Sequence, residues 1–370
     1  MLIDGRPPKI LILGEAAAVH AQRWVGHFRR RGWTVRWLSL GAIPSGVYAE
    51  PLVKMSLPRL AALFLSVRRL RRIVRTFAPD VISALFLPDY GWLATMAGVH
   101  PLVVSAWGSD ILIGPAKSRW HRRRIQYVLA RADRLVADAE LLRECMIALG
   151  AAPERIAIVP LGVDDEWLTL AEQRSDTPAS PLTVISCRRQ EPLYRVETLV
   201  TAAAQIVKEK PGRARFVIIG YGSRHDHLLR LAAQTGCADH ITFKPWLPAE
   251  ELREQFARSE IYVSTSSSDG TSVSLLEAMA AGCLPIVTDL PANREWVEPG
   301  VNGLVFPVGD ASALAEQIHR AVSDTSLRTA ARTRNAAIVA ARARWCDNMA
   351  QMERLMTDLI AAHSPAGGQT

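Results

Sequence analysis

The sequence predicts an α/β protein built from two doubly wound domains. The chain has 370 residues, about the length of two domains with some excess. Hydrophobic residues make up 49% of it, which is ample for two buried cores and excludes a disordered chain. Short apolar runs alternate with longer amphipathic stretches, the pattern of a parallel sheet covered by helices. Because ligands of such sheets bind beyond the carboxyl ends of the strands, we expect functional residues there.

The first half, residues 1–165, contains a series of runs with the length and composition of buried parallel strands. They are Lys9–Leu13, Thr34–Ser39, Val81–Ala84, Leu102–Ala106, Arg134–Ala137 and Ile156–Val159. Longer amphipathic stretches separate these runs. The pattern therefore predicts one doubly wound domain over this half.

A second series follows in residues 182–340. It consists of Leu182–Ser186, Phe216–Ile219, Ile241–Phe243, Ile261–Ser264, Pro285–Thr288 and Gly303–Phe306. Between the two series, residues 166–181 are rich in Glu, Ser, Asp, Thr and Pro, so we expect an exposed linker. The last predicted helix covers about residues 340–361, with Trp345, Met349, Met352 and Leu355 at helical spacing.

Cysteine usage and the absence of long apolar runs indicate the cellular compartment. The five cysteines are scattered and form no CxxC pair, as expected of a reduced cytosolic protein. We expect no signal peptide before the first strand, because Lys9–Leu13 already has the composition of a core strand, and no run approaches the roughly eighteen apolar residues that span a bilayer. We expect a soluble or peripheral protein in the cytoplasm.

Residues 266–296, SSSDGTSVSLLEAMAAGCLPIVTDLPANREW, are the most informative segment. Ser272 can cap a helix that runs through an apolar stretch and ends before Gly282. The first turn of such a helix offers unpaired N–H groups and a positive dipole end, which suit phosphate. Asp269 precedes the helix, and Glu277 lies about 8 Å along its axis from Ser272. Sugar hydroxyls at Asp269, phosphates at the helix start and a ribose at Glu277 would together form a nucleotide-sugar site.

This segment resembles the acid–seven-residue–acid motif of the family 4 retaining glycosyltransferases, part of glycosyl transferases group 1. The match continues through Pro285, residues 293–296, Gly300, residues 302–306 and residues 309–310. Most members have Glu at the first acidic position, where this chain has Asp269. The resemblance implies the GT-B fold, in which two Rossmann-like domains face a central cleft. It also implies an acceptor-binding first domain, a donor-binding second domain, and a terminal helix within residues 341–370 that crosses back to the first domain.

The resemblance assigns further residues to the donor. Relatives neutralise the donor diphosphate with an Arg, matched by Arg188, and with a Lys, replaced here by Tyr194 and Arg195. Arg suits this task because its planar fork grips phosphate bidentately. Arg195 can supply the missing charge, or Tyr194 a hydrogen bond only. The remaining donor-binding candidates are Gly270, Thr271, Ser272 and Val273 at the helix start, Gly220 and Gly222 in a turn after a strand, and Trp246 after the next strand.

In the first domain, the candidates follow two predicted strands. Asp110 is the catalytic carboxylate candidate, with the alternative that it caps a turn. Relatives often have a His at the position of Trp107, which here would stack on a sugar. His20 and Glu15 lie in the loop that in relatives helps to hold the acceptor. The resemblance therefore makes His20, Trp107 and Glu15 acceptor-binding candidates.

The net charge of +8 is concentrated in the first domain. Residues 51–79 contain no acid, and basic side chains from Arg59 to Arg75 interleave with apolar ones at helical spacing. A basic amphipathic helix of this kind suits an anionic membrane surface. The cluster RWHRRR at residues 119–124 adds to the charge. The alternative is that the apolar stripe faces the core and the arginines are only solvated. We expect no nucleic-acid partner, because no base-reading module accompanies the charge.

Together these features predict a retaining hexosyltransferase that uses a nucleotide diphosphate sugar and a glycan or lipid-linked acceptor in cell-surface polysaccharide synthesis. Asp269, Arg188 and Asp110 are its catalytic candidates. The sequence has no convincing DxD metal motif, so we expect neither a metal nor a cofactor. A GT-B binding subunit with little catalysis and a GT-B nucleotide-sugar epimerase are the alternatives.

Overall fold

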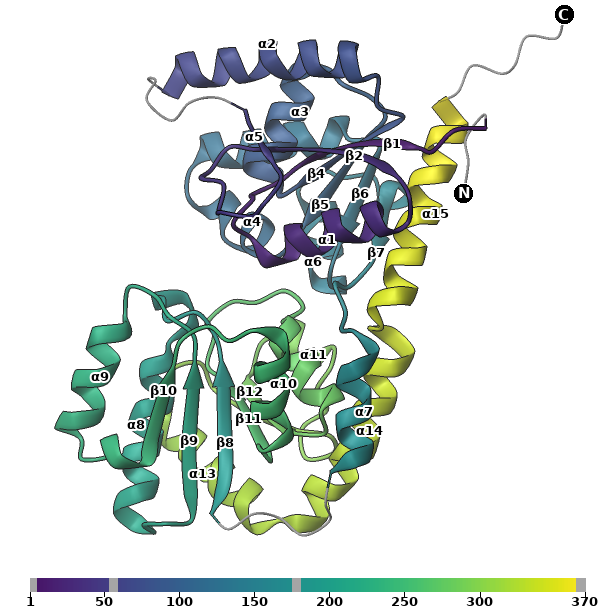
Figure 1. The fold of residues 1–370 in the computed structure, drawn as a ribbon. Helices are drawn as coiled ribbons and strands as arrows, with labels where there is room; N and C mark the ends of the chain where they lie inside the picture. The colour runs from purple at the N-terminus through teal and green to yellow at the C-terminus, as the bar shows by residue number, and fades with distance from the viewer. Residues whose placement is uncertain (1–4, 53–58, 175–180, 364–370) are drawn as a thin grey trace, which may run out of the picture. The chain divides into compact units, whose positions relative to one another are not determined.

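The computed structural model describes residues 5–52, 59–174 and 181–363 (Figure 1). The chain divides into two compact units. Unit 1 comprises residues 1–159 and 349–370, and unit 2 comprises residues 160–348. Each unit contains one sheet in which all paired strands are parallel. The two sheets confirm the predicted α/β class with doubly wound sheets.

The sheet of unit 1 has the strand order β3-β2-β1-β4-β5-β6-β7. Its strands are β1 (Lys9–Leu13), β2 (Thr34–Ser39), β3 (Glu50–Pro51), β4 (Val81–Leu85), β5 (Leu102–Ala106), β6 (Arg134–Ala137) and β7 (Ile156–Ile158). All but β3 were predicted, and β1, β4, β5 and β6 are short, mostly buried apolar runs, whereas β2 is half buried and β7 is only partly buried. The helices are α1 (Val19–Arg30), α2 (Arg59–Phe77), α3 (Trp92–Ala97), α4 (Ser109–Leu112), α5 (Arg119–Arg131) and α6 (Glu140–Ala148).

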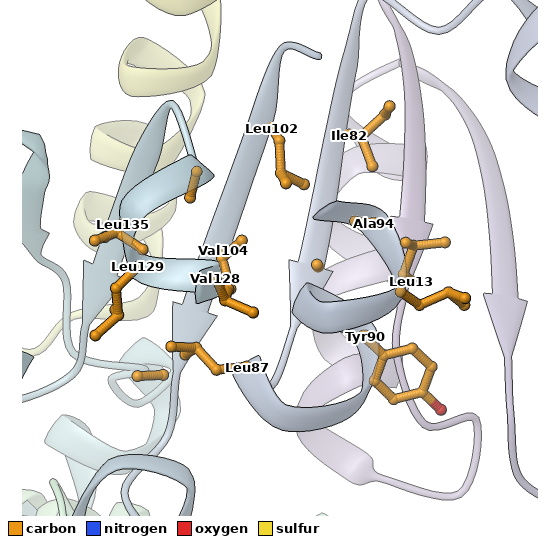
Figure 2. Close-up of a cluster of buried hydrophobic side chains, with 14 of the residues drawn as sticks. Leu13, Ile82, Leu87, Tyr90, Ala94, Leu102, Val104, Val128, Leu129 and Leu135 are labelled. Carbon is orange, nitrogen blue, oxygen red and sulfur yellow. The ribbon is translucent and has the colours of Figure 1, made fainter. Parts of the chain in front are cut away.

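One face of this sheet is covered by α2, α3, α5 and α6. Leu70 of α2, Leu93 of α3 and Val128 of α5 belong to the same buried cluster as Leu13 and Val104 of the strands. Figure 2 shows the strand side chains of this core pointing toward those of α3 and α5. The inner faces of these helices are therefore committed to the core.

The sheet of unit 2 has the order β10-β9-β8-β11-β12-β13. Its strands are β8 (Leu182–Cys187), β9 (Ala214–Ile219), β10 (Ile241–Lys244), β11 (Ile261–Ser264), β12 (Leu284–Thr288) and β13 (Leu304–Phe306), each within two residues of its predicted bounds. The helices are α7 (Asp165–Gln173), α8 (Val196–Glu209), α9 (His225–Gln234), α10 (Ala249–Ala257), α11 (Val273–Ala280), α12 (Pro291–Arg294), α13 (Ala311–Ser323) and α14 (Thr325–Arg342).

The prediction of an exposed linker at residues 166–181 is wrong for its first part, because residues 166–173 belong to the helix α7. Asp165 and Glu166 occupy the first turn, where acids are favourable near the positive end of the helix dipole. Trp167 is 3% exposed and packs edge-on against Phe256, with 5.3 Å between ring centroids. This apolar anchor fastens the segment to unit 2. Residues 175–180 lie outside the described residues.

The predicted terminal helix begins later than expected, with α15 at Trp345–His363. The chain leaves α14 after Arg342 because the backbone near Ala343 pairs with another segment. Val163 N donates to Ala343 O at 2.8 Å, and Trp345 N donates to Val163 O at 2.8 Å. From Met349 onward α15 belongs to unit 1. There Glu353 accepts from His27 of α1 at 2.7 Å.

Candidate active site

Arg188 lies at the carboxyl end of β8 and is the centre of a buried polar cluster in unit 2. Its side chain donates to Ser266 Oγ at 2.9 Å, to Ser274 Oγ at 3.4 Å and to Ser272 Oγ. It also donates to Asp269 Oδ2 at 2.5 Å. Burial alone would lower the pKa of Arg188, but the charge of Asp269 outweighs it and the pKa is raised. Arg188 is therefore a fixed positive charge held by hydroxyls and one carboxylate.

Arg188 and Asp269 form an ion pair that is largely shielded from water. Their side chains are 9% and 14% exposed, respectively. Removing one partner from such a pair leaves a buried charge and typically costs about 3–5 kcal/mol. The pair thus links the end of β8 to the turn after β11 (81 positions apart in sequence).

The start of α11 lies in the same cluster. Ser272 is the N-cap, as predicted, and its hydroxyl accepts from Leu275 N at 3.4 Å. Thr271 and Ser272 are buried, whereas Val273 and Glu277 are only half-buried, on a helix whose other residues are buried. Positions four apart share one helix face, so this partly open face carries the second acid of the motif.

Glu277 also lies within electrostatic reach of the end of β8. The pKa of the Cys187 thiol, one residue before Arg188, is raised first by burial and then by the charge of Glu277. The strand end, both acids and the helix start therefore gather at one edge of the sheet. The structure brings these predicted donor residues together.

Tyr194 and Arg195 occupy different places. The Tyr194 ring lies beneath the Arg188 guanidinium, 4.5 Å from its centroid, a cation–π contact. Arg195 points at Gly309, where an added Cβ would lie 2.6 Å from Arg195 Nη2. Gly309 has φ +81°, so a side chain there is unfavourable, whereas the flexible end of Arg195 could move aside. Tyr194 thus packs against the guanidinium of Arg188, and Arg195 lies near the end of β13.

The turn containing Gly220 and Gly222 packs on the segment after Arg188. An added Cβ at Gly220 would collide with Arg188 O, and one at Gly222 with Gln190 O. Gln190 is fully buried; it donates to Gly220 O at 2.8 Å and contacts His225 Nδ1 at 2.7 Å. These glycines therefore permit close backbone packing that positions the segment bearing Arg188. Trp246 is 52% exposed beside Gly220.

Sequence reasoning missed the hydroxyl groups that hold Arg188. Ser266 and Ser274 are its partners, and Tyr262 lies behind them, its hydroxyl 2.8 Å from Ser274 Oγ. Thr288 of β12 donates to Ser266 O at 2.7 Å and fixes the turn from the next strand. The signal was present as the run STSSSDGTSVS directly after a buried strand.

In unit 1, His20 and Trp107 lie together. His20 is in the first turn of α1, and Trp107 follows β5; their rings meet edge to face at 6.1 Å between centroids. Both are half-buried. The sequence predicted each residue to follow the carboxyl end of a strand, but not their contact.

Asp110 and Glu15 are engaged with the protein itself. Asp110 is 1% exposed and accepts from Leu87 N at 3.3 Å and Trp107 N at 3.2 Å. Burial raises its pKa to about 6. These hydrogen bonds to backbone N–H groups fit the alternative prediction, in which Asp110 caps a turn. Glu15 accepts from Tyr90 Oη at 3.2 Å and lies against Gly41, so it connects its own loop to a helical turn (Leu87–Gly91) and to the segment after β2.

Comparison with known proteins finds matches to two glycosyltransferase family models. Residues 170–339 match the model of glycosyl transferases group 1, and residues 9–139 match the model described as glycosyl transferase 4-like. Together the two matches cover most of the chain, which resembles the group 1 glycosyltransferases and has the GT-B fold. The resemblance agrees with the two parallel sheets and with the motif at Asp269 and Glu277.

Individual relatives are distant. The D-inositol 3-phosphate glycosyltransferase of Nocardia farcinica is 31% identical over 53% of this chain and 46% of its own length. The amylovoran biosynthesis glycosyltransferase AmsK of Erwinia amylovora is 28% identical over 65% and 61%, respectively. The chain thus spans about half to three fifths of these curated relatives. The structure of HepE of Anabaena in complex with UDP-glucose matches with a TM-score of 0.78 at 19% identity, covering 95% of this chain and all of that one. This likeness shows the fold.

The residues that the structure describes contain no helix long and apolar enough to cross a membrane. Nor do those residues contain a group of three or more His, Cys, Asp or Glu side chains placed to hold a metal ion.

Proposed function

We propose that this protein is a glycosyltransferase that moves a hexosyl group from a nucleotide diphosphate sugar to a glycan or lipid-linked saccharide. The transfer would retain the configuration at the anomeric carbon and would need neither a metal nor a cofactor. Its role would be in cell-surface polysaccharide synthesis. The observation that carries the proposal is the position of Arg188, held against the capped start of α11 and paired with Asp269. A diphosphate needs fixed positive charge and N–H donors, and this cluster offers both.

The chemistry would come from positioning and from stabilising the leaving group. The bond between the anomeric carbon and the diphosphate oxygen breaks, and a bond from the acceptor hydroxyl oxygen to that carbon forms on the same face. The acceptor proton is released, and the nucleotide diphosphate leaves. Arg188 and the N–H groups near Thr271 and Ser272 would take the developing negative charge, because fixed donors need no reorganisation.

The two acids would hold the donor at its ends. Asp269 would orient the sugar hydroxyls, and Glu277 the ribose. Because Asp269 is paired with Arg188, a bound diphosphate would compete for the guanidinium and free the carboxylate for the sugar. HepE, with UDP-glucose bound in its crystal structure, supports a nucleotide-sugar donor, and AmsK supports polysaccharide synthesis. We propose further that the enzyme works in the cytoplasm.

Thermal stabilisation by UDP-, GDP- and ADP-sugars tests the donor site. A ligand at 100 times its Kd stabilises the folded protein by about 2.7 kcal/mol, which raises the Tm. We expect one nucleotide class to do so, and Glu277→Ala to remove most of that effect and of turnover. Glu316→Ala, an exposed glutamate on α13, is the matched control and should behave as the parent protein. Full activity of Glu277→Ala would contradict the assignment.

The second candidate is a donor-binding subunit with little catalysis. It is favoured by Trp107, which cannot carry a proton, and by the buried contacts of Asp110. Donor binding without transfer or hydrolysis across a panel of acceptors would favour this candidate over the enzyme.

A further inference from the structure

The outer face of α2 is strongly basic. Seen along the helix axis, the buried or partly buried residues Val67, Leu70, Ile73 and Val74 form one stripe, which belongs to the core of unit 1. These four residues therefore face the core, as the alternative prediction stated, and cannot contact a membrane. The opposite side exposes Arg68, Arg69, Arg71, Arg72 and Arg75. We call these five residues the arginine face.

Two large apolar side chains accompany the arginine face. Phe64 is 60% exposed and Leu65 is 43% exposed. The Arg68 guanidinium lies over the Phe64 ring at 5.5 Å from its centroid. Large exposed hydrophobic groups among cations are not needed for solubility, so they indicate a partner that is both anionic and apolar.

The uncharged helix α3 connects the basic helices α2 and α5. Arg71 donates to Ala97 O at 3.0 Å and to Met96 O at 3.1 Å, which joins α2 to the end of α3. At the other end of α3, Trp92 meets Trp120 of α5 with ring centroids 6.4 Å apart. These helices cover the same face of the sheet, as Figure 1 and the shared core show.

The outer side of α5 repeats the composition of α2. Trp120 is 57% exposed, and Arg119, Arg122 and Arg123 are exposed around it. Arg124 lies between the rings of Trp92 and Trp120, at 5.3 and 4.9 Å from their centroids. Neither α2 nor α5 contains an acidic residue. Trp is the side chain most suited to the boundary between lipid tails and head groups.

We propose that the outer surface of α2, α3 and α5 docks on an anionic lipid bilayer. The arginines would contact the head groups, and Phe64, Leu65 and Trp120 would enter the boundary with the acyl chains. An acidic protein would pair with the charge alone, and nucleic acid could also stack on Phe64 and Trp120, but only a bilayer also accommodates the aliphatic Leu65. Docking does not depend on the donor site, so the two can fail separately.

Vesicle flotation with the full chain tests the proposal. We expect binding to phosphatidylcholine vesicles that contain about 30% phosphatidylglycerol, weak binding to pure phosphatidylcholine, and release by salt because head-group attraction is screened. Arg72→Glu with Arg75→Glu should weaken binding at least tenfold. Phe64→Ser with Leu65→Ser should weaken it severalfold at unchanged charge.

The matched control is Lys208→Glu with Arg230→Glu. These exposed cations lie on α8 and α9 of unit 2, and the pair changes the net charge by the same amount. The control should bind as the parent protein does. Equal loss in the control, or binding to polyuridylic acid but not to vesicles, would overturn the proposal. The Tm shift with a donor sugar, measured on every variant, checks folding and reads the donor site independently.

Discussion

The carboxyl ends of the strands differ between the two units. In unit 2, Arg188 ends β8 and is held by serine hydroxyls and by Asp269, from the turn after β11. In unit 1, Asp110 follows β5 and is bound by backbone N–H groups. In unit 2 the Arg188 guanidinium therefore lies beside the start of α11, where a ligand anion could also bind it. In unit 1 the Asp110 carboxylate instead holds backbone segments together. A charged residue at a strand end is therefore informative only through its partners.

Removing Arg188 should have the largest effect. Arg188→Ala should lower kcat/KM at least about a hundredfold, as for the loss of one fixed donor to a developing negative charge. It also leaves Asp269 as an unpaired, largely buried charge, at a cost of about 3–5 kcal/mol in the free energy of unfolding. Steady-state kinetics and urea denaturation measure both.

Two variants separate folding from chemistry at Arg188. Arg188→Ala combined with Asp269→Ala removes both charges, so stability should recover in part while activity stays low. Arg189→Ala changes the exposed neighbour and should leave both near normal. Parent-like kcat/KM in Arg188→Ala would contradict the role of this cation.

Asp110→Asn sharpens the contrast in unit 1. The pKa of Asp110 is raised from 3.8 to about 6 by burial, so the folded protein binds this proton more tightly than the unfolded chain. The contribution of Asp110 to stability is therefore greatest at low pH and is lost as the pH rises through about 6. The difference in free energy of unfolding between parent and variant should shrink by on the order of 2 kcal/mol from pH 4.5 to 7.5.

Turnover of the same variant decides between the two roles of Asp110. If Asp110 only holds loops together, the activity of Asp110→Asn should stay within about threefold of the parent at pH 7.5, after correction for the folded fraction. A loss of a hundredfold or more with an unchanged Tm would instead make Asp110 the catalytic carboxylate first predicted.

Of the core variants, Tyr262→Phe should have the smallest effect on stability. The variant loses one hydrogen bond to Ser274, whose hydroxyl keeps contacts with Ser272 and Arg188. Neutral hydrogen bonds contribute about 1 kcal/mol, so we expect a loss of that size and a severalfold fall in kcat. Tyr127→Phe in unit 1 is the control. An unchanged Tm would show that the hydroxyl behind Ser274 does not help to hold Arg188.

The sequence predicted what depends on neighbouring residues. Buried strands appeared as apolar runs, and the N-cap at Ser272 followed from its place before a helical stretch. It could not predict the Arg188–Asp269 pair, because that contact joins segments 81 residues apart. The helix α7 was missed because polar composition outweighed Trp167, whose partner Phe256 comes from another element. The two roles of Asp110 also stayed open, since burial decides between them.

The most direct measurement is a crystal structure of the chain with bound UDP. The account predicts that the diphosphate contacts Arg188 and the first N–H groups of α11, and that the Asp269 carboxylate moves away from the guanidinium. A diphosphate bound elsewhere, with the Arg188–Asp269 pair intact, would contradict it.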